Sequence, residues 1–130
     1  EISLGLVGSG RVKRDSIGMW GIDATEKYLA WFEQQEEQAK EKLLMAVRLL
    51  EEFGPTLGRP HADTLKGSDY KNLKELRAKT PKSVLRVAYI FDEKRKALIL
   101  IGGDKKGKKE SAFYKRLIAD AEELIKRYLK

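Results

Sequence analysis

Three segments with the alternating pattern of β-strands follow one another between residues 70 and 101, and this run limits the possible folds more than any other feature. The segments are residues 70–78, 84–91 and 97–101. In each of them successive side chains are expected to point to opposite faces of a sheet. The turns at Thr80-Pro81-Lys82 and at residues 92–96 are short. Because short connections join antiparallel neighbours, the pattern predicts a meander.

Helical segments lie on both sides of this meander. Residues 19–22 are typical of a short strand, after which Asp23 is a candidate N-cap with Glu26 at capping-box spacing. The first helix has Tyr28 and Phe32 at helical spacing, and Gln34-Gln35 is a plausible break. The second helix has one apolar stripe and ends at Gly54-Pro55: Ala39, Leu43, Ala46, Val47, Leu50 and Phe53.

The remaining segments complete an α+β fold. Residues 56–69 are rich in glycine, proline and polar side chains, which predicts a loop. Residues 111–129 predict a C-terminal helix with an apolar stripe: Phe113, Leu117, Ala121, Leu124 and Tyr128. We therefore expect a small domain in which an antiparallel β-sheet packs against an N-terminal helical hairpin and a C-terminal helix.

The chain of 130 residues is long enough for one domain, which we place at residues 19–130. Residues 1–18 are rich in glycine and serine, and we interpret them as an N-terminal extension that is non-native or flexible. They can still add a strand through Ile2-Ser3-Leu4.

Composition excludes several classes of function. The chain has no cysteine and one histidine, His61, which rules out a thiolate zinc site and a multi-histidine metal site. We expect no metal and no cofactor. The absence of cysteine suits a reducing cytoplasm, and no apolar run is long enough to span a membrane.

Charge is distributed unevenly. Residues 19–60 contain 5 Lys/Arg against 8 Asp/Glu, whereas residues 61–130 contain 19 against 10. This asymmetry indicates a scaffold side and a side that faces a polyanion, with nucleic acid as the first candidate.

A basic constellation is expected at one end of the meander. Arg86 lies within a very apolar strand, where it is either a functional group or an edge arginine that reaches water. Arg77 lies on the preceding strand, and the loop after Ile101 carries four lysines and leads to Tyr114: Lys105, Lys106, Lys108 and Lys109. Loop lysines alone are more often solvated surface, and His61 is more often a structural loop residue than a phosphate or base contact.

Two guanidinium groups, several ammonium groups and a phenol suit the metal-free cleavage of RNA. In that reaction the 2′-hydroxyl attacks the adjacent phosphate, and Arg and Lys stabilise the charge that grows on the transition state. A lysine with a depressed pKa or a tyrosine can move protons. Tyr114 can instead stack on a base.

Five segments resemble the RelE/ParE superfamily of toxin–antitoxin toxins, and in particular its phage-derived HigB-like branch. They are Leu-Leu-Glu-Glu-Phe-Gly-Pro (49–55), Leu-Gly-Arg-Pro-His-Ala-Asp-Thr-Leu-Lys-Gly-Ser (57–68), Asn-Leu-Lys-Glu-Leu-Arg (72–77), Leu-Arg-Val-Ala-Tyr-Ile-Phe-Asp (85–92) and Ile-Gly-Gly-Asp-Lys-Lys-Gly (101–107). The resemblance implies a RelE-like fold and a ribosome-dependent endoribonuclease that cuts mRNA. It also implies a cognate antitoxin, usually with a helix-turn-helix domain.

Matched onto this sequence, the resemblance makes Arg77, Arg86, Lys108 and Tyr114 the candidate catalytic residues. Six further lysines are candidate RNA-binding residues: Lys66, Lys71, Lys74, Lys105, Lys106 and Lys109. Glu75 stands where RelE has a lysine, which suggests that it orients Arg77. HigB toxins often have a histidine where this chain has Asp104-Lys105-Lys106, so the resemblance does not identify which residue acts as the general base.

The leading hypothesis is thus an mRNA interferase, whose partners are the ribosome, mRNA and an antitoxin. A ParE-like inhibitor of DNA gyrase shares the same fold and needs no catalytic set. A basic nucleic-acid-binding module without activity is the third alternative.

Overall fold

The computed structural model describes residues 2–3 and 19–129. In this part of the chain six strands form one sheet in the order β1-β2-β6-β5-β4-β3. The strands are β1 Ile2–Ser3, β2 Gly21–Ala24, β3 Ala62–Thr64, β4 Lys74–Thr80, β5 Ser83–Phe91 and β6 Lys96–Asp104. The helices are α2 Glu26–Glu33, α3 Glu37–Phe53 and α4 Glu110–Tyr128, with a 3₁₀ turn, η2, at Gly54–Thr56. The prediction of an α+β fold is confirmed.

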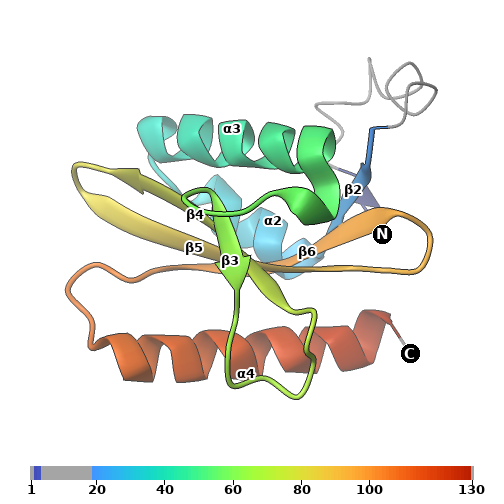
Figure 1. Cartoon of the computed structure of the whole chain (residues 1–130). Coiled ribbons are helices and arrows are strands. Elements are labelled where there is room, and N and C mark those ends of the chain that lie inside the picture. The colour runs from blue at the N-terminus through green and yellow to red at the C-terminus, as the bar shows by residue number, and fades with distance from the viewer. Residues whose placement is uncertain (1, 4–18, 130) are drawn as a thin grey trace.

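The sheet lies between α3 on one face and α4 on the other, and α2 packs beside α3 (Figure 1). Each face has its own hydrophobic cluster. Leu43, Val47 and Leu50 of α3 pack on the first face, whereas Phe113 and Leu117 of α4 pack on the second. Because both faces are covered, the central strands carry apolar residues at nearly every position.

The meander of β4, β5 and β6 is antiparallel, as predicted. Leu85, Val87 and Tyr89 of β5 face the α3 side, and Ala88 and Ile90 face the α4 side. β5 lies between β4 and β6, so Arg86 occupies a central strand. Its side chain is only 12% exposed. The alternative of an edge arginine that reaches water is therefore wrong.

One pair of strands departs from an antiparallel sheet. β2 runs parallel to β6, with Gly21 opposite Lys96 and Ala24 opposite Ile99. This pairing keeps the strand extended beyond the predicted end at residue 22, so Asp23 is not the N-cap. Thr25 caps α2 instead: its Oγ1 accepts a hydrogen bond from the Tyr28 backbone N–H at 3.0 Å and donates one to the Leu100 carbonyl at 2.6 Å.

The predicted loop at residues 56–69 contains a strand. Residues 62–64 pair antiparallel with residues 74–76 of β4. Three residues are too few to show an alternating pattern, which is why the sequence did not indicate this strand. β4 itself begins at Lys74 rather than at residue 70, because residues 70–73 form the turn that brings β3 beside it.

Residues 2 and 3 pair with Ala24 and Asp23 at the edge of the sheet, in agreement with the strand allowed at Ile2-Ser3-Leu4. Leu4 and the rest of residues 4–18 lie outside the described residues. The boundary between an extension and a domain at residues 18 and 19 stays a prediction. Among the described helices, none has the length and apolarity needed to cross a membrane.

Candidate active site

Four side chains, joined by two hydrogen bonds and an ion pair, form a cluster where β4 and β5 face the first turns of α4. Arg77 and Arg86 are directly opposite each other in the β4–β5 pair, which places both on the α4 side. Arg86 Nε donates a hydrogen bond to the Tyr114 hydroxyl at 3.0 Å. Arg77 Nε donates one to Glu75 Oε2 at 3.0 Å, and Glu75 Oε1 lies 3.7 Å from Arg86 Nε as an ion pair. The buried carboxylate of Glu75 thus lies between the two guanidinium groups.

A second acidic residue ties β3 to this cluster. Asp63 Oδ2 lies 3.4 Å from Arg77 Nη2 and 2.9 Å from Arg59 Nη2. The backbone N–H of Thr64 and the charges of Arg59 and Arg77 hold the pKa of Asp63 below its usual value, against the effect of burial. Asp63 is therefore ionised at neutral pH and fixes the position of Arg77.

The cluster opens into a cavity of about 680 Å³. Arg77, Arg86 and Tyr114 line it together with Lys66 and Lys105. The rest of the wall comes from α4 and from the segments around β3 and β4: Glu110, Ser111, Arg59, Asp63, Thr64, Leu65 and Glu75. A cavity with five basic groups at its surface suits a phosphate-bearing ligand.

Tyr114 is protonated at neutral pH. Burial raises the pKa of its hydroxyl; the hydrogen bond from Arg86 lowers it, and the neighbouring Glu75 carboxylate adds to the rise. For Arg77, burial disfavours the charged form, but Glu75, Tyr114 and Asp63 together outweigh burial and raise its pKa. The site therefore combines fixed positive charges with a phenol that can donate a proton.

The loop lysines divide into separate groups. Lys105 Nζ lies 3.1 Å from Glu110 Oε1 and 5.6 Å from the centre of the Tyr114 ring, so it belongs to the cavity. Lys106 Nζ donates to the Pro81 carbonyl at 2.8 Å, outside the cavity. Lys108 and Lys109 line a different hollow, between α2 and α4.

The two predicted lysines near the start of β4 lie elsewhere. Lys74 points to the α3 side, where its Nζ donates to the Pro55 carbonyl at 3.2 Å. Lys71 is exposed in the turn before β4 and is not part of the cavity wall. The structure thus brings together Arg77, Arg86, Tyr114, Lys66 and Lys105, and separates the other predicted site residues from them.

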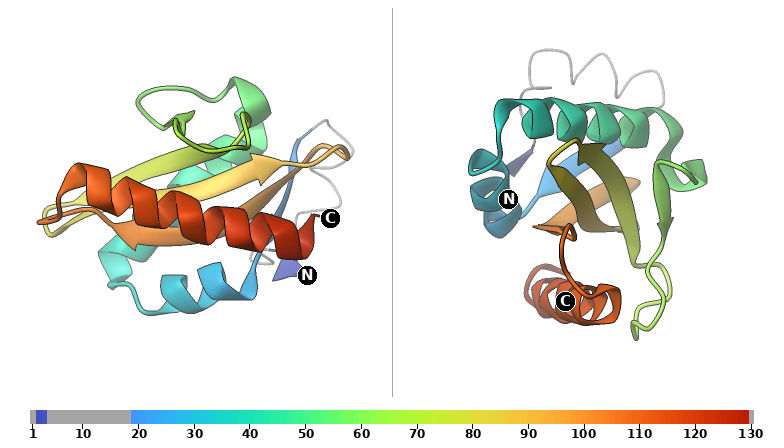
Figure 2. Two further views of the ribbon diagram at one scale, coloured as in Figure 1. Left: turned by 90° about the horizontal axis from the view of Figure 1, so that it is seen from below. Right: turned by 90° about the vertical axis from the view of Figure 1, so that its left-hand side faces the viewer.

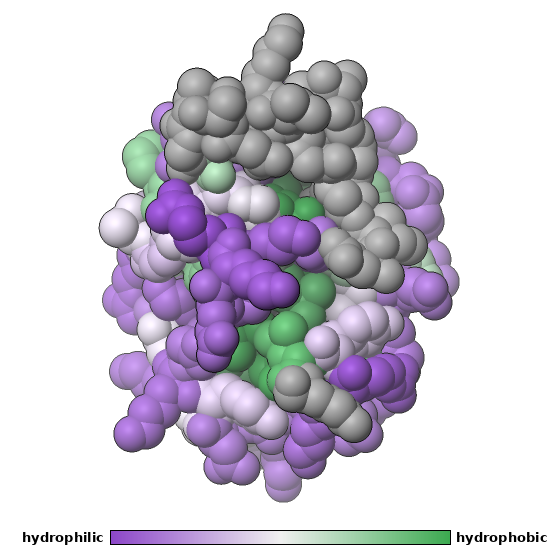
Figure 3. All heavy atoms as spheres, turned by 90° about the vertical axis from the view of Figure 1, so that its right-hand side faces the viewer, coloured by the Kyte–Doolittle hydropathy of each residue, from purple (hydrophilic) through white to green (hydrophobic). Residues whose placement is uncertain are grey.

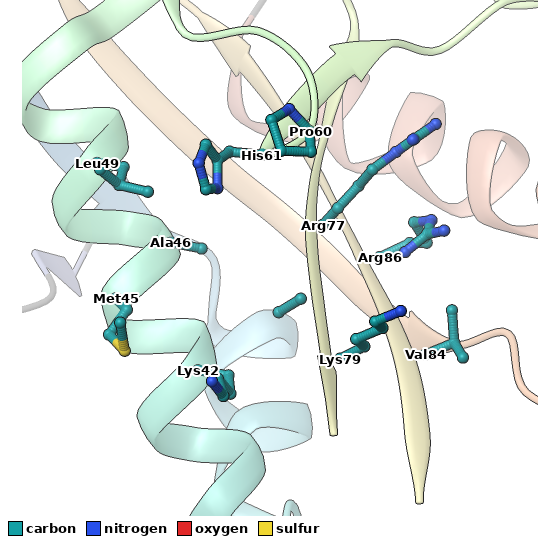
Figure 4. A pocket seen from close by; sticks show the side chains of 11 residues that line it. Lys42, Met45, Ala46, Leu49, Pro60, His61, Arg77, Lys79, Val84 and Arg86 are labelled. Carbon is teal, nitrogen blue, oxygen red and sulfur yellow. The ribbon is translucent and has the colours of Figure 1, made fainter. Parts of the chain in front are cut away.

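His61 lies in a cleft on the other side of β4. This cleft, about 570 Å³ in volume, lies between α3 and the hairpin of β4 and β5. In Figure 4 His61 faces Leu49 and Ala46 of α3, whereas the side chains of Arg77 and Arg86 point away from α3. The His61 backbone carbonyl accepts a hydrogen bond from the Arg77 backbone N–H at 2.8 Å. Arg77 and Arg86 also line this cleft, but among the described residues no hydrogen bond or ion pair joins the His61 imidazole to either arginine.

The opposite end of the molecule has a different surface character. The face in Figure 3 carries a hydrophobic strip bordered by hydrophilic residues. The C-terminal end of α4 and the β5–β6 turn lie at this end, where Ile90, Ile125 and Tyr128 help to line a hollow of about 560 Å³. The lysine loop, residues 105–109, lies at the other end of the sheet (Figure 1).

Sequence reasoning missed Arg59 and Asp63 as parts of the site. Their spacing of four residues is unremarkable in a segment interpreted as a loop, and only the pairing of β3 with β4 brings them to Arg77. Within residues 2–3 and 19–129 there is no group of three or more His, Cys, Asp or Glu that could hold a metal ion.

By its fold, this chain belongs to the class of small basic proteins that share the fold of RelE. A structure of the E. coli toxin RelE in the free state, with two arginine-to-alanine substitutions, superimposes with a TM-score of 0.56. The match covers 86% of this chain and all of RelE at 18% sequence identity. At that identity the likeness establishes the fold alone.

The chain belongs to the family of phage derived proteins that are Gp49-like, whose profile matches residues 30–126. It is 37% identical over 116 residues to a Mycobacterium tuberculosis protein named "Putative toxin HigB2". It is 42% identical over 77 residues to another, "Putative toxin HigB3". These alignments cover 88% and 59% of this chain, but only 56% and 66% of the relatives. The predicted resemblance to the HigB-like branch of the RelE superfamily is confirmed.

Proposed function

We propose that this chain is the toxin of a toxin–antitoxin system and cleaves mRNA on the ribosome without a metal ion. The observation that carries the proposal is the cluster of Arg77, Glu75, Arg86 and Tyr114 at the wall of a basic cavity. The names of the HigB relatives and the fold of RelE support it. Two arginines and a phenol beside one cavity are suited to stabilising the charge of a phosphate transition state and to protonating its leaving group.

The proposed reaction is a transesterification within the RNA. The 2′-oxygen forms a bond to the adjacent phosphorus and releases its proton to solvent water. The bond from phosphorus to the 5′-oxygen breaks at the same time, and that oxygen takes up a proton to become a 5′-hydroxyl. The products are a 2′,3′-cyclic phosphate and a 5′-hydroxyl, and no water or metal is consumed. Arg77 and Arg86 would bind the non-bridging oxygens, whose negative charge grows in the transition state.

Tyr114 is suited to the role of general acid. Its raised pKa keeps the hydroxyl protonated at neutral pH, so it can donate a proton to the departing 5′-oxygen but cannot accept one from the 2′-hydroxyl. Arg86, which donates to the phenol oxygen, would stabilise the phenolate that forms as the proton leaves.

The ribosome would supply the position of the substrate. The cavity is open and is lined by long, partly exposed side chains, so it holds a flexible RNA poorly by itself. Fixing the mRNA on the ribosome would bring the reacting phosphate into line with the arginines and would reduce the entropic cost of the reaction. A cognate antitoxin of the helix-turn-helix type is the proposed inhibitor, and the cytoplasm is the proposed location.

The test is cell-free translation with purified wild type and Arg86→Ala, with mRNA ends mapped by primer extension. Cuts that require both ribosomes and wild-type protein are the expected result. Cleavage should fall at least a hundredfold for Arg86→Ala, since one transition-state donor contributes about this much. Circular dichroism of the variant controls for folding, and Lys94→Ala, in the turn at the far end of the sheet, controls for the loss of one charge.

Intact mRNA together with arrested growth would contradict the proposal. A DNA supercoiling assay on the same protein would then test the inhibition of gyrase. Equal inhibition by wild type and a folded Arg86→Ala would also contradict it, because the arginine cluster would have no part in the effect.

A further inference from the structure

A second groove lies beside the candidate cavity, between α2 and α4. Its volume is about 690 Å³, and its wall includes Trp31 of α2, Phe113 and Arg116 of α4, and Lys108 and Lys109 of the connecting loop. Gly102 and Gly103 of β6 contribute to the wall between the helices. Figure 2 shows α2 and α4 on either side of β6.

The two glycines allow aromatic rings to approach the backbone of β6. A Cβ at position 102 would lie 2.3 Å from the Trp31 ring, and one at position 103 would lie 3.0 Å from the Phe113 ring. Only glycine fits at position 102 without movement of the indole. The backbone thus holds both rings at the groove, and Trp31 remains partly exposed.

Two ammonium groups at the groove have no carboxylate partner among the described residues. Lys108 Nζ lies 5.9 Å from the centre of the Phe113 ring, and Lys109 is exposed at the start of α4. By contrast, Lys105 is paired with Glu110, and Arg116 with Asp120 at 3.4 Å. Lys108 and Lys109 are therefore the cations that are available to bind phosphate.

The groove and the cavity share the first turn of α4. Phe113 lines the groove and the next residue, Tyr114, lines the cavity, and their ring centres are 5.3 Å apart. A single-stranded RNA that crosses the loop of residues 105–109 can therefore contact both the groove and the cavity. β2 pairs with β6 only as far as Ile99, so no described strand covers the edge of β6 beside the groove.

From these observations we infer that the groove is a second RNA subsite, which binds a nucleotide that flanks the scissile phosphate. Its base contacts the partly exposed Trp31, and its phosphates contact Lys108 and Lys109. Aromatic surface next to unpaired cations is the usual arrangement for single-stranded RNA. The inference rests on the proposed function, because it takes RNA to be the substrate that is cleaved at the neighbouring cavity. It gives Lys108 a role in substrate binding in place of the catalytic role predicted from the sequence.

The test uses the full chain with Trp20→Phe, which leaves Trp31 as its one tryptophan. A 2′-O-methylated hexanucleotide is the probe, because it lacks the attacking hydroxyl and cannot be cleaved. Quenching of Trp31 fluorescence reports contact of a base with the indole, and a titration gives the dissociation constant. Anisotropy of a labelled probe on the chain with Trp20 intact provides a second measurement.

The double substitution Lys108→Gln with Lys109→Gln should weaken RNA binding about tenfold. It should also reduce the slope of the logarithm of the association constant against the logarithm of the salt concentration by about 1.4, the value for two phosphate contacts on a single-stranded RNA. The matched control, Lys94→Gln with Lys126→Gln, removes the same charge from the β5–β6 turn and the last turn of α4, and it should change binding less than twofold.

Equal weakening by both double variants, or RNA binding without quenching of Trp31, would overturn the inference. Either result leaves the proposed function intact if ribosome-dependent cleavage is observed. Quenching with the expected loss in the Lys108/Lys109 variant, but without any cleavage, would instead uphold the subsite and contradict the nuclease.

Discussion

At the scale of single residues, both arginines of the candidate site have Glu75 as a partner. Its side chain is 3% exposed and lies within reach of Arg77 and Arg86. A buried charge is tolerated when it has partners, and loss of one partner leaves the others uncompensated. The two guanidinium groups, held near each other across the β4–β5 pair, would repel without this carboxylate.

Glu75→Gln should therefore impair both stability and activity. We expect the free energy of unfolding to fall by about 2 kcal/mol, since Arg86 is nearly buried and Arg77 is partly screened by solvent. Cleavage should fall by about tenfold or more because the arginines lose their positions. Urea denaturation and primer extension measure the two effects. Glu93→Gln, in the exposed β5–β6 turn, is the control and should change neither the free energy of unfolding nor the cleavage. A Glu75→Gln protein with wild-type stability and cleavage would contradict the role of Glu75.

The raised pKa of Tyr114 leads to a prediction about pH. A general acid is active below its pKa, so a phenol whose pKa lies above the ordinary value of about 10 should stay competent throughout the neutral and mildly alkaline range. Single-turnover cleavage by the wild type should thus show no loss attributable to Tyr114 between about pH 7 and 9. Tyr114→Phe should reduce cleavage at least tenfold while RNA binding changes little. Loss of binding without a change in the cleavage rate would indicate a stacking role.

At the scale of elements, the contact of α2 with β6 depends on Gly102. Ala at this position places a methyl group against the indole of Trp31, and we expect the free energy of unfolding to fall by about 2 kcal/mol. Gly58→Ala is the matched control, because the nearest atom would be 4.0 Å away, and it should be nearly neutral. Thermal unfolding of both variants tests the packing, and equal melting temperatures would show that Trp31 moves away at little cost.

The loop before β4 is attached to α4 by Glu122. Its Oε2 accepts hydrogen bonds from Ser68 Oγ at 2.6 Å and from the Asp69 backbone N–H at 2.9 Å, and these bonds lower its pKa. A lowered folded-state pKa means that the stabilisation is present above the unfolded-state pKa of about 4.3 and is lost as the pH falls through the folded value.

Glu122→Gln should cost about 1 kcal/mol at pH 7, after allowance for its partial exposure, and progressively less as the pH falls below 4. Urea denaturation across this range measures the difference from the wild type. Glu123→Gln, the adjacent exposed carboxylate, serves as the control. A difference that is constant with pH would mean that the charge of Glu122 does not contribute.

Helices and strands with a sustained pattern of apolar residues could be predicted from the sequence. Short elements and contacts that depend on pairing with a distant segment could not. The stripes of α3 and α4 reveal the helices because one face of each is buried, and the nearly continuous apolar run of β5, bounded by turns, reveals the centre of the meander. β3 has three residues and exists because β4 is beside it, and the cap at Thr25 depends on β2 pairing with a strand more than 70 residues later. In the same way Arg77, Arg86 and Tyr114 could be predicted as candidates, but Arg59 and Asp63 are brought to them only by tertiary pairing.

At the scale of the whole molecule, the candidate cavity and the groove adjoin one end of α4, and the hollow lined by Ile125 and Tyr128 adjoins the other. The candidate cavity and the groove with Lys108 and Lys109 both adjoin the first turn of α4. The hydrophobic strip of Figure 3 and the C-terminal turns of α4 (Figure 1) lie at the other end. Strand β1 lies at the edge of the sheet beside β2, whereas the arginine cluster lies on β4 and β5, nearer the other edge.

Removal of residues 1–18 tests whether residues 19–130 are a domain. The described part of this segment that pairs with the sheet is β1, two residues long at an edge. We therefore expect a chain that begins at Met19 to unfold cooperatively, with a melting temperature lower by about 4 °C, which corresponds to about 1 kcal/mol. Ribosome-dependent cleavage should stay within twofold of that of the full chain, because β1 and the arginine cluster are on separate strands. Loss of cooperative unfolding in the shortened chain would show that residues 1–18 belong to the domain.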